Sequence, residues 1–160
     1  GDPENTLYLD TKDGRITIRM RPDLAPKHVA QIKTLVRRGF YNGLTFHRVI
    51  DGFMAQTGDP NGNGTGGSDL PDLPGEFTTA EKFKRGTVGM ARSRSPNSAN
   101  SQFFINYAAA PNLDGAYTIW GEVVSGMDVV DKIKKGDARA NGTVSAPDKI
   151  IRMQVAADAK

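Results

Sequence analysis

Apolar and polar residues alternate in two short segments near the start of the chain, at residues 6–10 (TLYLD) and 15–20 (RITIRM). An alternation with a period of two predicts strands with one buried face, and the Asp-Gly pair between them favours a tight hairpin turn. Six further apolar segments predict strands at 44–50, 53–58, 87–92, 101–107, 117–124 and 149–156. The pattern therefore predicts eight strands, mainly antiparallel.

Two other segments have the spacing of an amphipathic helix. The first begins near Pro26, ends before Gly39 and is about a dozen residues long. Its apolar face is formed by Val29, Ile32, Leu35 and Val36. The second covers residues 127–135 and ends at Gly136. Eight strands with two helices predict a mainly β fold, in which a closed barrel leaves no exposed sheet edge and the helices cover its ends.

No linker or repeat divides the 160 residues, so we expect a single domain over residues 1–160. Residues 1–4 are expected to be a flexible start, and Gly1 is interpreted as an expression or processing remnant. No apolar run approaches the roughly 20 residues that span a bilayer, which favours a soluble protein without a membrane partner. The 21 basic and 18 acidic residues nearly balance, so charge does not predict a nucleic-acid partner.

Several kinds of chemistry find no support in the residue inventory. The chain has no cysteine, which excludes disulfides and thiol catalysis. Of its two histidines, we expect His28 on the solvent face of the first helix and His47 in a packing or orienting role within a strand. Neither has carboxylates at ligand spacing, so no metal site and no cofactor are expected. The glycine-rich run 62–67 lacks the lysine of a phosphate loop and is interpreted as a flexible surface loop.

The segment FHRVIDGFMAQTGDP (46–60) sets an arginine among apolar and amide side chains. Such a surface can hold a peptide without cleaving it. Rotation about an Xaa-Pro bond faces a barrier of roughly 18–20 kcal/mol and needs only a dry pocket, a donor for the proline nitrogen and polar groups for the neighbouring carbonyls. Lowering that barrier by about 7 kcal/mol would accelerate rotation on the order of 100,000-fold. The alternative is a proline-peptide binding module or chaperone that uses the same groove without turnover.

The chain resembles the cyclophilins over nearly its whole length. The resemblance is carried by residues 46–60 together with GTGG (64–67), GEF (75–77), MARSRSPNSANSQFFI (90–105) and LDG (113–115). The segment 90–105 is similar to the bacterial branch of the family. The resemblance implies the eight-stranded cyclophilin barrel with two capping helices and peptidyl-prolyl cis-trans isomerase activity on Xaa-Pro segments of unfolded or folded proteins. Nothing in the sequence suggests more than a monomer, and the expected compartment, the bacterial cytoplasm or the periplasm, is left open.

The resemblance further implies the residues of the site. Arg48 would polarise the proline amide, and the walls of the proline pocket would be Phe53, Met54, Phe104 and Leu113. The substrate backbone would be held by Gln56 and Gln102, and the groove for residues before proline would be lined by Ala91 and Arg92. Strand alternation puts Gln102 with Phe104, and Met54 with Gln56, on shared faces. It gives Phe53 the opposite face, so either a bulge or the bend at Gly52 turns the side chain, or the strand has a different phase.

Two positions depart from the animal cytosolic cyclophilins. Asn112 stands where those proteins carry a tryptophan at the rim of the groove, and the only tryptophan, Trp120, lies on a predicted strand. Tyr117 stands where they carry a histidine, and its ring can stack on proline while its hydroxyl donates. We therefore expect catalysis to persist, with cyclosporin a possible but weakened ligand.

Overall fold

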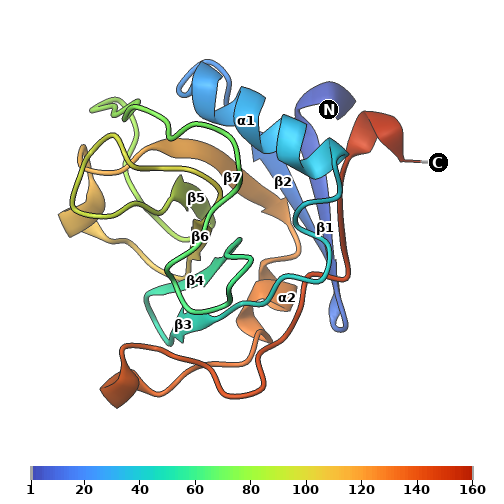
Figure 1. The fold of residues 1–160 in the computed structure, drawn as a ribbon, viewed down its shortest axis with the longest axis vertical. Helices are drawn as coiled ribbons and strands as arrows, with labels where there is room; N and C mark the ends of the chain where they lie inside the picture. The colour runs from blue at the N-terminus through green and yellow to red at the C-terminus, as the bar shows by residue number, and fades with distance from the viewer. Residues whose placement is uncertain (1, 160) are drawn as a thin grey trace.

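The computed structural model describes residues 2–159, so that Gly1 and the interpretation given to it lie outside the described residues. Its eight-stranded sheet curls into a barrel (Figure 1). The strands are β1 (Thr6–Thr11), β2 (Gly14–Met20), β3 (Arg48–Ile50), β4 (Met54–Thr57), β5 (Thr87–Met90), β6 (Phe103–Asn106), β7 (Ile119–Ser125) and β8 (Arg152–Val155). Their neighbour order is β3-β4-β6-β5-β7-β2-β1-β8, and every pair is antiparallel. The predicted mainly β fold is confirmed.

β3 and β8, at the two ends of this order, are not paired as strands. The residues just before each of them are joined instead. The Phe46 N–H donates to the Asp148 carbonyl at 2.9 Å, and the Ile150 N–H donates to the Leu44 carbonyl at 2.8 Å. The two ends of the curled sheet therefore meet through backbone outside the regular strands, which makes β3 and β8 shorter than the sequence pattern predicts.

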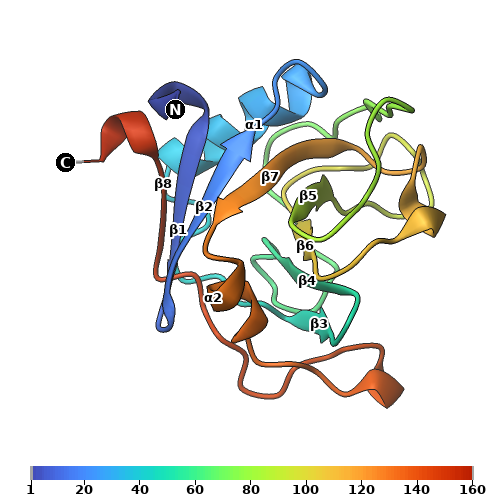
Figure 2. The same cartoon turned by 180° about the vertical axis from the view of Figure 1, so that it is seen from behind.

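The helices α1 (Pro26–Arg37) and α2 (Met127–Asp131) lie at opposite ends of the barrel (Figures 1 and 2). α1 has the predicted start and length. α2 ends four residues early, because the chain turns to run beside β3: the Gly136 N–H donates to the Val49 carbonyl at 2.8 Å. A Cβ atom at Gly136 would lie only 1.9 Å from the Gly142 carbonyl oxygen, so this close approach requires glycine.

The two faces of the sheet carry separate apolar clusters. Along β6, Phe103 and Ile105 point into the barrel and Phe104 points out, as strand alternation requires. The interior also holds Trp120, which packs edge-to-face on Phe103 with the ring centroids 5.4 Å apart. The outer cluster consists of Met54, Phe83, Phe104, Ala110, Leu113 and Ile119. The interior supplies the main core, which leaves the outer face free to form a site.

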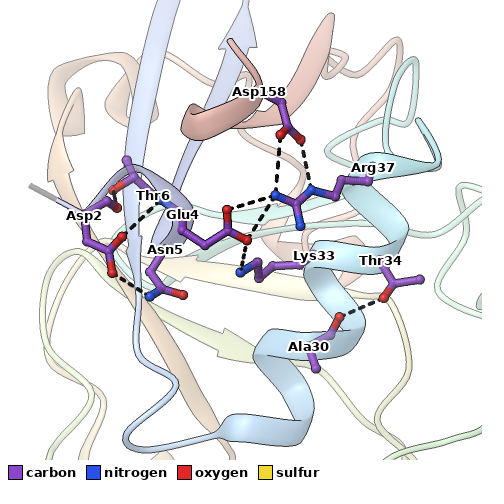
Figure 3. Close-up of polar contacts among 9 residues, drawn as sticks. All are labelled: Asp2, Glu4, Asn5, Thr6, Ala30, Lys33, Thr34, Arg37 and Asp158. Atoms are coloured by element: carbon purple, nitrogen blue, oxygen red, sulfur yellow. Dashed lines mark hydrogen bonds and ion pairs between the residues drawn. The ribbon is translucent and has the colours of Figure 1, made fainter.

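The two ends of the described chain meet beside α1 (Figure 3). The Glu4 carboxylate lies 2.7 Å from the Lys33 ammonium and 3.0 Å from the Arg37 guanidinium. Arg37 also donates to Asp158, at 2.9 Å. Residues 2–4, expected to be a flexible start, are in fact held against α1, because charges on that helix are close to them in space although distant in sequence.

Candidate active site

One transverse row of residues crosses four strands on the outer face of the sheet. Arg48 of β3 lies opposite Gln56 of β4, Gln56 lies opposite Phe104 of β6, and Phe104 lies opposite Gly89 of β5. Residues directly opposite one another in paired strands share a face. The register of the sheet therefore brings a cation, an amide and an aromatic ring together from distant parts of the sequence.

A cavity of about 270 Å³ opens beside this row. Its lining contains ten of the eleven site residues expected from the sequence: Arg48, Phe53, Met54, Gln56, Ala91, Arg92, Phe104, Asn112, Leu113 and Tyr117. The eleventh, Gln102, lines an adjoining cavity of about 410 Å³ between the glycine-rich loop and residues 91–101. The structure thus gathers the whole expected set around two neighbouring cavities.

Phe53 reaches the cavity although strand alternation assigned it to the opposite face. The strand begins only at Met54, and Phe53 belongs to the turn before it. In that turn Gly52 adopts φ 77°, and the Phe53 N–H donates to the Ile50 carbonyl at 3.0 Å. The bend at Gly52 turns the ring, so the predicted start of the strand at residue 53 was wrong, whereas Met54 and Gln56 share one face as strand alternation predicted.

The floor of the cavity depends on residues that the sequence did not single out. The Phe104 ring stacks on Phe83 with centroids 5.7 Å apart and meets the Tyr117 ring edge-on at 6.1 Å. A Cβ atom at Gly89 would lie 2.7 Å from ring atoms of both Phe104 and Phe83. Any larger residue at position 89 would therefore clash with these two rings in their observed positions. Neither Gly89 nor Phe83 could be recognised from sequence, because each looks like an ordinary strand or loop position.

The Arg48 side chain is held by three hydrogen bonds. Its Nε–H donates to the Asn141 carbonyl at 2.9 Å, Nη2 donates to the Asn141 Oδ1 at 3.1 Å, and Nη1 donates to the Gln56 Oε1 at 3.0 Å. A guanidinium has five N–H donors, so two remain without a partner among residues 2–159. Burial lowers the pKa of Arg48, although a guanidinium keeps its charge at any physiological pH. The site therefore offers fixed, charged donors at the edge of an apolar cavity.

Amide side chains continue this network between the two cavities. Gln56 Nε2 donates to Gln102 Oε1 at 2.9 Å, and Gln102 Nε2 donates to the Gly66 carbonyl at 2.8 Å. Each Nε2 carries a second N–H, which leaves both residues able to donate to a peptide. Gln56 and Gln102 therefore orient each other and Arg48 in addition to the substrate-binding role expected of them.

Arg92 is mostly engaged within the chain. Its Nε and Nη2 donate to the Ala116 carbonyl at 3.1 and 2.7 Å. Its Nη1 donates to the carbonyls of Ser93 and Arg94 at 2.9 and 3.3 Å. The guanidinium carbon lies 4.4 Å from the centroid of the Tyr117 ring, a cation–π geometry. Arg92 therefore fastens the rim that carries Tyr117 and has little donor capacity left for a peptide.

The glycine-rich loop has a fixed anchor at Asp59, a residue only 1% exposed. Its carboxylate accepts hydrogen bonds from the backbone N–H groups of Asn61 at 2.8 Å, Asn63 at 3.0 Å and Gly64 at 2.5 Å. Burial alone would raise the pKa of Asp59, but these donors outweigh it and lower that pKa. The buried Asp59 carboxylate therefore holds the backbone of the loop that forms one wall of the 410 Å³ cavity.

His28 is not on the solvent face of its helix, so that expectation was wrong. Its side chain is fully buried, and Nε2 lies 2.8 Å from the Pro74 carbonyl oxygen, which identifies Nε2 as the protonated nitrogen. The His28 backbone N–H donates to the Glu76 carboxylate at 2.8 Å. The loop around these residues folds over the first turn of α1, a tertiary contact that helical periodicity cannot reveal. His47 is 5% exposed, as the expected packing role requires.

These buried histidines should make the fold sensitive to mild acid. Burial lowers the pKa of both His28 and His47 below the usual 6.5. Near pH 6 the unfolded chain therefore binds more protons than the folded one, so the free energy of unfolding should fall as the pH drops below about 6.5. The slope is at most about 1.4 kcal/mol per pH unit for each histidine. Urea unfolding at pH 7, 6 and 5 measures it, and an unchanged slope in His28→Gln would contradict the assignment to His28.

Comparison with known proteins identifies the family. The model of the cyclophilin type peptidyl-prolyl cis-trans isomerase family matches residues 6–155. A Brucella suis protein described as a probable peptidyl-prolyl cis-trans isomerase is 62% identical over 170 aligned residues, which cover 99% of this chain and 86% of that protein. This chain belongs to the cyclophilin-type peptidyl-prolyl cis-trans isomerases, and the activity expected from the sequence is confirmed at that level.

Solved structures agree with this assignment. A cyclophilin from Hirschia baltica matches with a TM-score of 0.88 and 29% identity, covering 99% of this chain and 76% of that one. A cyclophilin-type isomerase from Cryptosporidium parvum, crystallised in the presence of the dipeptide Ala-Pro, matches with a TM-score of 0.85 and 28% identity, covering 94% and 98%. The cyclophilin barrel expected from the sequence is therefore confirmed.

Within residues 2–159, no helix is both long and apolar enough to cross a membrane. The same part of the chain has no cluster of three or more histidine, aspartate or glutamate side chains placed to hold a metal ion.

Proposed function

We propose that the 270 Å³ cavity is where this isomerase binds the proline of an Xaa-Pro segment and where the bond is twisted, without any covalent intermediate. The observation that carries the proposal is the position of Arg48, which keeps two N–H donors that no residue of the described range 2–159 pairs with. These donors stand at the edge of a cavity walled by Phe53, Met54, Phe104 and Leu113. The apolar wall suits a proline ring, and the Cryptosporidium relative was crystallised with a proline dipeptide. The cavity size also suits one residue rather than a large cofactor.

Arg48 supplies the chemistry in this mechanism. Resonance between the proline nitrogen and the preceding carbonyl resists rotation, and it is lost when the nitrogen lone pair localises. An N–H of Arg48 donates to that lone pair as the bond twists, so the hydrogen bond is stronger in the transition state than in either ground state. Because Arg48 is already fixed by Gln56 and Asn141, little reorganisation is needed at that moment.

The surrounding residues hold the peptide. The free N–H groups of Gln56 and Gln102 bind carbonyls next to proline, and the groove beside Ala91 takes the residues that precede it. The Tyr117 ring, fastened by Arg92, covers one side of the proline. We further propose that the chain acts as a monomer on exposed Xaa-Pro segments of unfolded or folded proteins, without a nucleic-acid partner, in keeping with its formal net charge of only +3.

Exchange spectroscopy on an Ala-Pro peptide tests this proposal against binding without turnover. A small fraction of protein should raise the cis-trans exchange rate of the peptide by several orders of magnitude, since unaided exchange takes tens to hundreds of seconds. Substrate signals that broaden while the exchange rate stays at its uncatalysed value would identify a binding module instead. A proline-free Ala-Ala peptide serves as the control for nonspecific binding.

A further inference from the structure

We propose that Asn141 is a positioning residue of this active site, which sets the direction of the free donors of Arg48 without touching the substrate. This role depends on the proposed function of Arg48. Asn141 lies 93 residues further along the chain, in the loop after α2, and no sequence pattern connects the two.

The contacts come from two different atoms of the same residue. The backbone carbonyl of Asn141 accepts from Arg48 Nε at 2.9 Å, and its Oδ1 accepts from Nη2 at 3.1 Å. Together they hold one edge of the planar guanidinium, while Gln56 holds Nη1 from the other side. Without the Oδ1 contact, the guanidinium could turn about its Cδ–Nε bond and its free donors would lose their common direction. Fixed direction is what makes such donors effective in a transition state.

The backbone of Asn141 explains why asparagine occupies this position. Its φ is 57° and its ψ is 32°, the left-handed region that glycine and asparagine adopt most readily. Glycine would fit the backbone but would provide no side-chain acceptor. Aspartate would provide an acceptor but would set a full negative charge against the catalytic cation. Asparagine is the residue that combines the left-handed backbone with a neutral acceptor.

The loop that carries Asn141 is itself fixed to β3, beside which it runs (Figure 2). The Val49 N–H donates to the Gly142 carbonyl, and the Gly136 N–H donates to the Val49 carbonyl, both at 2.8 Å. A Cβ atom at Gly142 would lie 3.3 Å from Arg48 Cγ and 2.5 Å from a side-chain carbon of Ile50. The glycine therefore lets the loop lie directly against the arginine, and the strand and the loop form one rigid support.

The variant Asn141→Gly tests this role with little disturbance of the backbone, because glycine accepts a positive φ and keeps the carbonyl that binds Nε. We expect kcat/KM for the Ala-Pro peptide to fall about tenfold, the scale of one hydrogen bond to a charged group, mainly through kcat. The control is Ala146→Gly, at a second non-glycine residue with a positive φ in the same loop. It should leave turnover unchanged. An Asn141→Gly protein with wild-type kcat/KM would overturn the proposal.

A double-mutant cycle separates positioning from a general structural effect. In an Arg48→Ala background, Asn141→Gly should change the residual rate less than twofold, because there is no guanidinium left to direct. A tenfold loss in that background would also overturn the role of Asn141. If Arg48→Ala alone kept near wild-type turnover, the proposed function of Arg48 would fail instead. As a spectroscopic readout, Arg48 should show separate, slowly exchanging Nη signals in the wild type that merge in Asn141→Gly; unchanged signals would count against the proposal.

Discussion

Replacing Arg48 with alanine should remove most turnover and leave the fold intact. We expect a loss of about 100- to 1,000-fold in kcat/KM, corresponding to the roughly 2.7–4 kcal/mol supplied by one fixed donor to developing charge. The side chain lies on the outer face of the sheet and its contacts are polar, so the apolar interior is not disturbed. Exchange spectroscopy on an Ala-Pro peptide gives the rate, and circular dichroism with thermal unfolding verifies the fold.

A matched control is Arg19→Ala, which removes an exposed strand arginine paired with Glu122 on a part of the sheet distant from the cavity. This variant should retain the wild-type rate. If a folded Arg48→Ala protein also retained it, the assignment of Arg48 would be wrong, and the rate acceleration would have to come from the other residues around the cavity.

Replacing Asn112 with tryptophan should tighten cyclosporin binding by about 1–3 kcal/mol, the usual value of burying a large apolar side chain. Asn112 is exposed in the short 3-10 helix Pro111–Leu113, at the edge of the cavity. An indole there offers a bulky ligand both area and a donor, whereas the amide offers little area and is strongly hydrated. A small Xaa-Pro substrate uses the inner wall, so its turnover should change less than a few-fold. Titration calorimetry on both proteins measures the difference.

The control for a nonspecific gain is Val124→Trp, which enlarges an exposed apolar side chain on β7 outside the cavity. It should not change the affinity. Equal tightening by both variants, or a wild-type protein that already binds as tightly as Asn112→Trp, would show that Asn112 at the rim does not limit the affinity for cyclosporin.

The spacing of apolar residues predicted well those elements whose start and end signals lie within the segment itself. The β1–β2 hairpin and α1 were found with nearly their true bounds, because alternation, the Asp-Gly turn and the flanking Pro26 and Gly39 all lie within the segments themselves. The strands next to the barrel seam were predicted too long. Where they end depends on which backbone meets which across the seam, and no single segment contains that information.

The site residues also fall into two groups: those that a local motif predicts, and those whose environment depends on distant segments of the chain. The motifs that carry the family resemblance, at 46–60, 90–105 and 113–115, predicted Arg48 and the apolar residues that line the cavity. Asn141, Gly89 and the burial of His28 were missed, since each owes its environment to a loop or strand distant in sequence. Phe53 belongs partly to both groups. The resemblance predicted that it lines the cavity, but only the turn at Gly52 explains how its side chain reaches that face.

The order of the strands also determines when the chain can fold. β1 lies between β2 and β8, with Leu7 opposite both Ile18 and Val155. During synthesis the hairpin partner emerges within a few residues, whereas the second partner emerges only after nearly all of the sheet has been made. Pairing between such distant segments is slow, and an unpaired strand edge invites association with other chains. A nascent chain of this isomerase therefore keeps an open sheet edge until residue 155 has left the ribosome, and throughout that time it is itself exposed to aggregation.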